Sequence, residues 1–189
     1  TVSIMLHMEH KSYKLEIILE LLKENNHARG LAKKLNANHM TISRKIKELF
    51  KENAVDYKED GRNKVYSLKK TAEARTYIFM SENYKLLSTI KKYPQLRRII
   101  EHIQKEDKIN VALLFGSYAK WIAKKDSDVD IFVETSTKKI KEQLEDFDSK
   151  LSVKTGKYDK KNLLIKEIEK NHVVIKGAQT YYEKNKFFE

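Results

Sequence analysis

Residues 114–133 have the sequence LFGSYAKWIAKKDSDVDIFV, in which ten residues separate a Gly-Ser pair from an Asp-Val-Asp triplet and apolar sequence flanks both. The apolar run 109–115 predicts a buried strand that ends at Gly116, where backbone freedom permits a sharp turn. The run 129–135 alternates, and it predicts a second strand that projects Asp128 and Asp130 from one face. The segment therefore predicts two strands of one sheet, joined through a turn and a loop.

Both ends of this segment suit metal-assisted phosphoryl chemistry. Gly116 and Ser117, opening a helix, would offer backbone N–H groups and a hydroxyl to an anion such as a triphosphate. Asp128 and Asp130, about 7 Å apart along one strand face, could share a divalent cation, Mg²⁺ or Mn²⁺, because hard cations prefer oxygen ligands and bridge to phosphates. The plain alternative is a Gly-Ser turn that leads into a solvated acidic loop containing Asp126.

The spacing of Gly-Ser, ten residues and Asp-x-Asp between two strands resembles the nucleotidyltransferase superfamily of DNA polymerase beta, specifically its minimal nucleotidyltransferase branch. The resemblance implies that Gly116 and Ser117 bind the phosphates of a nucleoside triphosphate (NTP). It also implies that Asp128 and Asp130 are the catalytic metal ligands. The expected substrate is therefore an NTP, with Mg²⁺ or Mn²⁺ as cofactor.

The family normally adds a third carboxylate from a later strand, which we predict here at residues 151–155. The site-facing positions of that strand would be Ser152 and Lys154, and neither is acidic. Asp148 and Asp159 flank the strand and could bend in. The ammonium of Lys154 would repel a second metal ion and could pair with Asp130 or with a phosphate instead. Whether the domain is an active enzyme therefore stays open.

The first seventy residues predict three helices followed by a β-hairpin. Apolar spacing indicates helices at 13–23, 29–35 and 39–52, with Asn38 as the N-cap of the third. Short alternating runs at 54–57 and 64–68 flank a turn with Asp-Gly at its centre. This order resembles the winged helix-turn-helix family, which implies binding to double-stranded DNA through the third helix and the hairpin wing. The corresponding residues are Thr41, Ser43, Arg44 and Lys47 on the helix and Arg62 and Lys64 on the wing.

The alternative for those basic residues is an ordinary solvated surface used for dimerisation or protein contact. Residues 72–93 predict one long helix, which ends at the single proline, Pro94, before another helix at 95–103. The long helix serves either as the dimerisation element of a homodimer or as packing for its own domain. Further helices are predicted at 138–147 and 162–170, with a short apolar run at 172–176.

We therefore expect an α+β protein of three parts. These are a winged helix-turn-helix domain at 1–70, a helical connector at 71–105 and a small mixed-sheet nucleotidyltransferase-like domain at 106–189. The net charge of +12 divides into +6, +4 and +2 over these parts, so the excess positive charge favours nucleic acid as the partner of the first two.

Other bulk features bound the function. The chain has no cysteine, which excludes disulfides and thiolate metal sites. No apolar stretch approaches the roughly 18 residues of a membrane span, and the N-terminus does not resemble a signal peptide, so we expect a cytoplasmic protein without membrane contact. The leading function is a DNA-associated nucleotidyltransferase that transfers a nucleoside monophosphate to an acceptor hydroxyl. The alternatives are a non-enzymatic transcription regulator with a nucleotide-sensing domain and, by family analogy alone, the antitoxin of a toxin–antitoxin pair that modifies a co-encoded protein.

Overall fold

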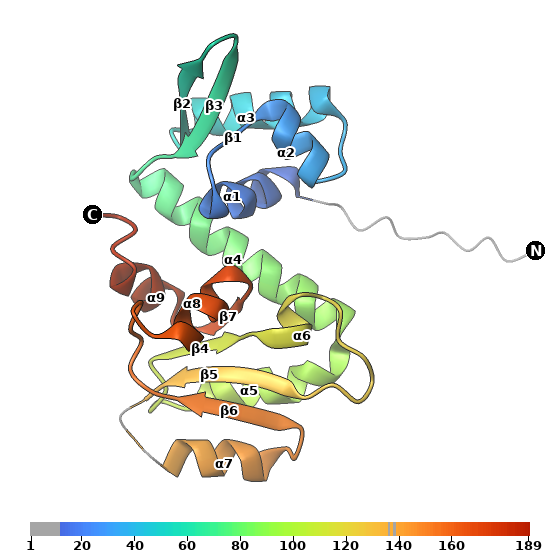
Figure 1. Cartoon of the computed structure of the whole chain (residues 1–189), viewed down its shortest axis with the longest axis vertical. Helices are drawn as coiled ribbons and strands as arrows, with labels where there is room; N and C mark the ends of the chain where they lie inside the picture. The colour runs from blue at the N-terminus through green and yellow to red at the C-terminus, as the bar shows by residue number, and fades with distance from the viewer. Residues whose placement is uncertain (1–11, 136, 138) are drawn as a thin grey trace, which may run out of the picture. The chain divides into compact units, whose positions relative to one another are not determined.

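The computed structural model describes residues 12–135, 137 and 139–189 (Figure 1). The chain divides into two compact units, and the boundary falls between Tyr77 and Ile78. This boundary lies inside helix α4 (Ala72–Lys92), whose first turns belong to the first unit and whose remaining turns belong to the second. Each unit has a sheet of its own. No helix in the described ranges has the length and hydropathy needed to cross a membrane.

The first unit contains the three helices and the hairpin that the sequence predicts. Its elements are α1 (Tyr13–Lys23), β1 (Asn26–His27), α2 (Ala28–Lys34), α3 (His39–Lys51), β2 (Val55–Asp60) and β3 (Asn63–Leu68). The core residues recur at helical spacing, with Ile18 of α1, Leu31 of α2 and Ile46 of α3 fully buried. The Asn38 side chain accepts a hydrogen bond from the backbone N–H of Met40 (2.8 Å), so it is the N-cap of α3 as predicted.

The hairpin differs from the prediction in length and in the position of its turn. Both strands are six residues long, and Asp60 pairs with Asn63, which leaves Gly61 and Arg62 as a two-residue loop. Gly61 has a φ of +57°, a conformation that glycine adopts without strain. The centre of the turn is therefore Gly-Arg, not Asp-Gly. The first strand continues through polar residues that show no apolar alternation, which is why the sequence pattern ended it early.

The second unit is a mixed four-stranded sheet with helices on both faces. After a 3₁₀ turn (η1, Pro94–Leu96), its elements are α5 (Arg97–Lys105), β4 (Val111–Leu114), α6 (Gly116–Ala119), β5 (Val129–Glu134), α7 (Lys139–Phe147), β6 (Leu151–Thr155), α8 (Leu163–Lys170), β7 (Val173–Lys176) and α9 (Ala178–Lys184). The strand order is β6-β5-β4-β7. β5 and β6 are parallel, whereas β4 is antiparallel to β5 and to β7. The α+β class and the mixed sheet agree with the prediction.

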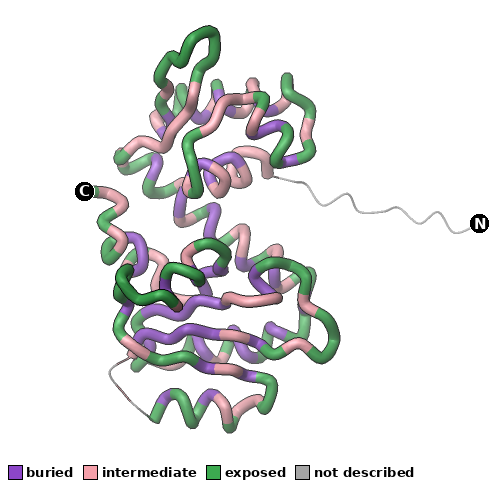
Figure 2. Tube along the Cα trace, in the orientation of Figure 1, coloured by how far each residue is buried: buried purple, intermediate pink, exposed green. Residues whose placement is uncertain are grey.

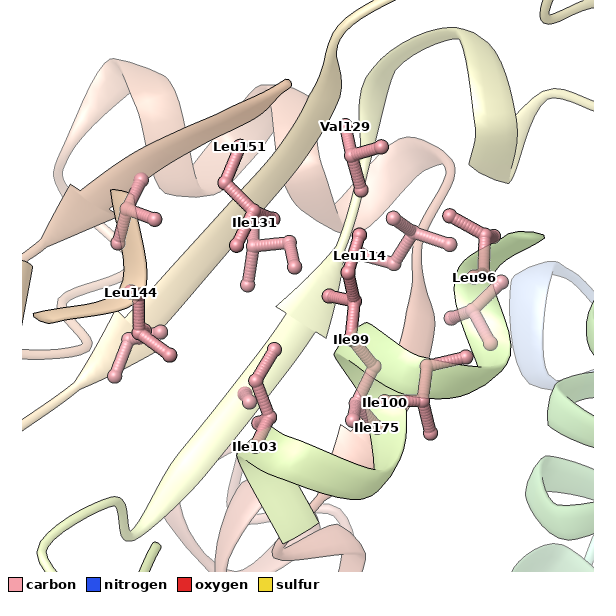
Figure 3. Packing of buried hydrophobic residues seen from close by; sticks show 14 of the residues in the cluster. Leu96, Ile99, Ile100, Ile103, Leu114, Val129, Ile131, Leu144, Leu151 and Ile175 are labelled. Carbon is pink, nitrogen blue, oxygen red and sulfur yellow. The ribbon is translucent and has the colours of Figure 1, made fainter. Parts of the chain in front are cut away.

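One face of this sheet forms the hydrophobic core. Figure 2 shows the central strands as mainly buried. Figure 3 shows Ile99 and Ile103 of α5 against Leu114 and Ile131, and Leu144 of α7 belongs to the same cluster. Burying several such side chains contributes roughly 1.5 to 3 kcal/mol each relative to exposure. Because side chains alternate along a strand, the residues between the core positions of β5 must face the opposite side of the sheet.

That opposite face carries Asp130, Phe132 and Glu134. Phe132 packs edge-on against Tyr158, with ring centroids 6.5 Å apart. A carboxylate oxygen of Glu134 accepts hydrogen bonds from the backbone N–H of Tyr158 and from Lys184 Nζ, both at 3.0 Å. These contacts close the end of the face at the C-terminus of β5. Asp130, at the other end of the strand, is only half-buried.

Candidate functional site

The structure brings the Gly-Ser turn and the acidic pair together. β4 ends at Leu114, and the next residue, Phe115, donates a backbone hydrogen bond to the carbonyl of Asp130 (2.9 Å). Gly116 then turns sharply with a φ of +69°. A Cβ atom at position 116 would lie 2.2 Å from Oδ2 of Asp130, closer than any side chain allows. The turn therefore requires glycine for two reasons, its left-handed backbone and its contact with the carboxylate.

Ser117 follows in the short helix α6, which has only four residues. Its carbonyl accepts a hydrogen bond from the backbone N–H of Ile122 (3.0 Å), which closes the chain into a compact loop. The next residue, Tyr118, is buried and packs edge-on against Tyr93, with ring centroids 4.9 Å apart. The half-buried Ser117 is thus fixed beside Gly116 by packing of the residue that follows it.

Trp121 anchors the far side of this loop, a feature that the sequence pattern did not indicate. Its indole N–H donates to Oγ1 of Thr89 (3.3 Å), and its carbonyl accepts from Lys92 Nζ (2.7 Å). The Lys92 ammonium also lies 4.9 Å from the indole centroid. Trp121 itself has a φ of +61°, which is unusual for a bulky residue. The end of α4 thus holds the loop that contains Gly116.

The two aspartates differ in environment. Asp128 is exposed just before β5, whereas Asp130 is half-buried within it. Burial raises the pKa of Asp130, and the charge of Asp128 raises it further, while hydrogen bonding to Ser152 and the charge of Lys154 lower it. The two carboxylates therefore repel each other in the absence of a cation. A divalent ion between them would remove this repulsion.

The site fits Mg²⁺ or Mn²⁺ bound to two protein carboxylates. Mg²⁺ usually takes one or two carboxylates and completes its shell with waters and substrate phosphates. Because Gly116 has no Cβ, Oδ2 of Asp130 lies directly beside the turn. Among the described residues, no group of three or more His, Asp or Glu side chains could hold a metal ion. Asp128 and Asp130 are the two described carboxylates that would hold the ion here.

Strand register defines the position on β6 at which the family resemblance implies a third carboxylate. On β6, Ser152 pairs with Asp130 and Lys154 pairs with Phe132, so Ser152 is the direct neighbour of the acid. Neither flanking acid bends in. Asp148 accepts a hydrogen bond from the backbone N–H of Lys150 (3.0 Å), and Asp159 accepts one from Lys161 (2.9 Å), so both cap local turns.

The candidate DNA-contacting residues lie on α3 and on the wing. Arg44 and Lys47 of α3 are exposed, as is Arg62 at the hairpin tip. Thr41 and Ser43 are half-buried, and Ser43 Oγ lies 3.3 Å from Nε2 of His39. The Lys64 ammonium lies 3.9 Å from the ring centroid of Tyr57.

The sequence analysis did not single out Met40. This side chain is 72% exposed, four residues before Arg44 and seven before Lys47, so the three lie along one stripe of α3. Helical spacing was the signal that could have identified it.

Comparison with known proteins assigns the second unit. Residues 97–186 match the family described as Polymerase beta, Nucleotidyltransferase. This segment is a polymerase beta nucleotidyltransferase domain. The nucleotidyltransferase domain begins with α5 and extends past α9, so it contains the whole four-stranded sheet and the site around Gly116.

Two solved structures are similar to part of this chain. The adhesin competence repressor of Streptococcus pyogenes is 18% identical, with 49% of this chain and 69% of that chain covered and a TM-score of 0.40. A homodimeric winged helix-turn-helix DNA-binding domain of Mycobacterium bovis, described as a possible ArsR-family regulator, is 13% identical, with 43% and 72% covered and a TM-score of 0.34. No curated protein matches the chain.

Proposed function

We propose that the chain is a DNA-associated nucleotidyltransferase that binds an NTP with Mg²⁺ and transfers a nucleoside monophosphate to an acceptor hydroxyl. The observation that supports this most directly is the contact between Gly116 and Asp130. Phosphoryl transfer needs phosphate-binding groups and a bound cation within one substrate's length of each other. The contact between the turn and the carboxylate meets this requirement.

Each part of the site has a role in the proposed reaction. Asp128 and Asp130 would hold the cation, which when bound neutralises phosphate charge and polarises the α-phosphorus. The Gly116 backbone and the Ser117 hydroxyl would position the phosphates. The acceptor oxygen bonds to the α-phosphorus, pyrophosphate leaves, and the hydroxyl proton passes to solvent. The rigid packing of Tyr118 on Tyr93 would keep the phosphate-binding turn in place during this exchange.

The first unit would direct this activity to duplex DNA. In this proposal α3 enters the major groove with Arg44 and Lys47, Thr41 and Ser43 lie at its edge, and the wing reaches the backbone with Arg62. The exposed Arg44 and Lys47 lie on the same stripe, as one groove-facing surface requires. We expect this interaction to be strongly dependent on salt.

A second candidate function is favoured by the residues beside Asp130. Ser152 and Lys154 stand on the site-facing side of β6, where a carboxylate would help to bind a second cation. In this case the domain binds an NTP and regulates DNA binding without transfer. The antitoxin hypothesis keeps the transfer reaction and makes a co-encoded protein the acceptor.

The deciding experiment incubates the full chain with α-labelled NTPs and Mg²⁺, together with duplex DNA or with the products of neighbouring genes. We expect label to reach an acceptor in a Mg²⁺-dependent manner, and to disappear with the Asp128→Asn/Asp130→Asn variant. Mg²⁺-dependent NTP binding without transfer would favour the sensor. If the wild type neither binds nor transfers any NTP, both functions are wrong.

A further inference from the structure

We infer that Lys154 is a phosphate-binding residue of the nucleotide site, so that the site takes a nucleotide with one bound cation and one protein ammonium. This inference rests on the proposed function, because it assigns the ligand of the same site. It follows from the register of β6, from the surroundings of the lysine side chain and from the charges that face it.

The register places Lys154 on the face of the sheet that carries Asp130. Ser152 is the neighbour of Asp130, and Lys154 lies two residues further along the same strand, or about 7 Å. Leu151 and Val153, which alternate with these two residues along β6, belong to the core on the other face. A lysine stem spans most of that distance, so the length of the side chain allows the ammonium to reach the space beside Asp130.

The other neighbours of Lys154 on this face offer it no partner. Phe132, directly across on β5, is buried and packs on Tyr158. Glu134, the next carboxylate along β5, is buried and already pairs with Lys184 at 3.0 Å. Within the described part of the chain, Lys154 has no carboxylate within 4.0 Å. The exposed ammonium therefore stays available to a ligand that reaches Asp130.

The charges of the site favour a polyphosphate as that ligand. A triphosphate carries more negative charge than one divalent cation neutralises, and Asp128 and Asp130 add two further negative charges. An ammonium on the same face would offset part of this excess and fix one phosphate oxygen by a charge-assisted hydrogen bond. A nucleoside without phosphates would gain nothing from Lys154. If Lys154 binds phosphate, its substitution weakens the binding of nucleotides but not of nucleosides. A purely structural role would weaken both.

Calorimetry on the full chain tests the inference. Each NTP is titrated into the protein in the presence of Mg²⁺ and, separately, in the presence of EDTA. Adenosine serves as the ligand without phosphate. The variants are Lys154→Gln, Lys154→Arg and, as the matched control, Lys157→Gln, which changes an exposed lysine just beyond β6. We expect Lys154→Gln to weaken binding of the preferred NTP about tenfold, with and without Mg²⁺. Lys154→Arg should retain most of the affinity, and Lys157→Gln should be unchanged.

The outcomes separate the two proposals. If the wild type binds an NTP and Lys154→Gln binds it as tightly as Lys157→Gln does, the role of Lys154 is wrong and the nucleotide site stands. An equal loss of adenosine and NTP affinity in Lys154→Gln would also overturn the role, because it would show a structural effect. If the wild type binds no NTP under any condition, the proposed function fails together with this inference.

Discussion

Gly116 and Asp130 are in such close contact that a Cβ atom on the glycine would lie 2.2 Å from the aspartate Oδ2. The anion-binding turn and the cation-binding carboxylate of the proposed site are therefore adjacent parts of one structure. The contact arises because Phe115 donates its backbone N–H to the Asp130 carbonyl, which fixes the end of β4 against β5. Changes at either residue are expected to affect the other.

Gly116→Ala should lower both the stability and the NTP affinity. The left-handed backbone alone costs an alanine about 1 to 3 kcal/mol, and the methyl group must also displace the Asp130 carboxylate. Gly156→Ala is the control, because a Cβ there meets nothing within 4 Å. That control should change the free energy of unfolding by less than about 1 kcal/mol. Urea unfolding and NTP titration measure both effects, and equal behaviour of the two variants would contradict the geometry.

Asp128→Asn and Asp130→Asn should each remove Mg²⁺-dependent NTP binding and transfer while the fold is retained. Both residues are at least partly exposed, so an amide of the same shape is tolerated. Asp126→Asn, an exposed acid in the same loop, is the control and should keep wild-type affinity. Calorimetry with Mg²⁺ and NTP gives the comparison. Unchanged affinity in the double variant would show that the metal site lies elsewhere.

Arg44→Ala combined with Lys47→Ala should weaken binding to duplex DNA, by roughly 1 to 3 kcal/mol if a base contact is lost and by less for phosphate contacts. The salt dependence of binding should also become shallower. The charge-matched control is Lys166→Ala with Lys170→Ala, which removes exposed charges from α8. Anisotropy titrations over a range of salt concentrations test this. Equal losses in both pairs would indicate a non-specific charge effect.

Ser152→Asp should strengthen divalent cation binding, because it places a third carboxylate next to Asp130 in the parallel register. One added charge near a surface is worth about 1 to 2 kcal/mol at this range, or roughly a tenfold change in affinity. Lys154→Asp, two residue pairs further along β6, should have a smaller effect on the cation. Mn²⁺ titration of both variants measures the difference. A larger gain in Lys154→Asp would show that the register does not determine the coordination.

His172 should make the second unit less stable as the pH falls. The ring is buried against Ile168, whose carbonyl lies 3.1 Å from Nδ1, and burial lowers the pKa of His172 to about 3. The unfolded chain binds a proton below its ordinary pKa of 6.5, whereas the folded protein does not. Stability is therefore fully present above pH 6.5 and declines towards pH 3, by at most about 1.4 kcal/mol per pH unit.

The variant His172→Gln should lose this slope even if it is less stable throughout. His102→Gln is the control, because His102 stacks on Phe147 and is only half-buried. Urea unfolding at a series of pH values measures the slopes. An unchanged slope in His172→Gln would show that other groups govern the acid response.

Local patterns predicted several elements with the bounds observed. The helix Tyr13–Lys23 and the strand Leu151–Thr155 match because their apolar spacing is complete within the segment. The two-residue strand Asn26–His27 was not predicted, since it exists only through pairing with Tyr66 and Val65 of β3. Pairing between distant segments leaves no periodic signal in so short a strand.

The site shows the same division between local and long-range information. Spacing within one segment was enough to nominate Gly116 and Asp130. The register of β5 and β6 determines which residue of β6 lies beside Asp130. The sequence predicted that Ser152 and Lys154 share the site-facing side of this strand, but it did not distinguish which of them is the neighbour. The turn-capping hydrogen bond of Asp148 likewise depends on backbone geometry that follows from the fold. Sequence reasoning therefore nominated the residues of the proposed site but not their arrangement.

Trp121 is the single tryptophan of the chain, and it sits five residues after Gly116 in the loop that α4 holds. The residue is 41% exposed, its indole N–H donates to Thr89, and the Lys92 ammonium lies near the ring. Indole emission responds to hydration and to nearby charge, so any movement of this loop changes the fluorescence of the unlabelled protein. The molecule thus contains an intrinsic optical probe next to the Gly116 turn, and a screen for ligands of the proposed site needs no added dye.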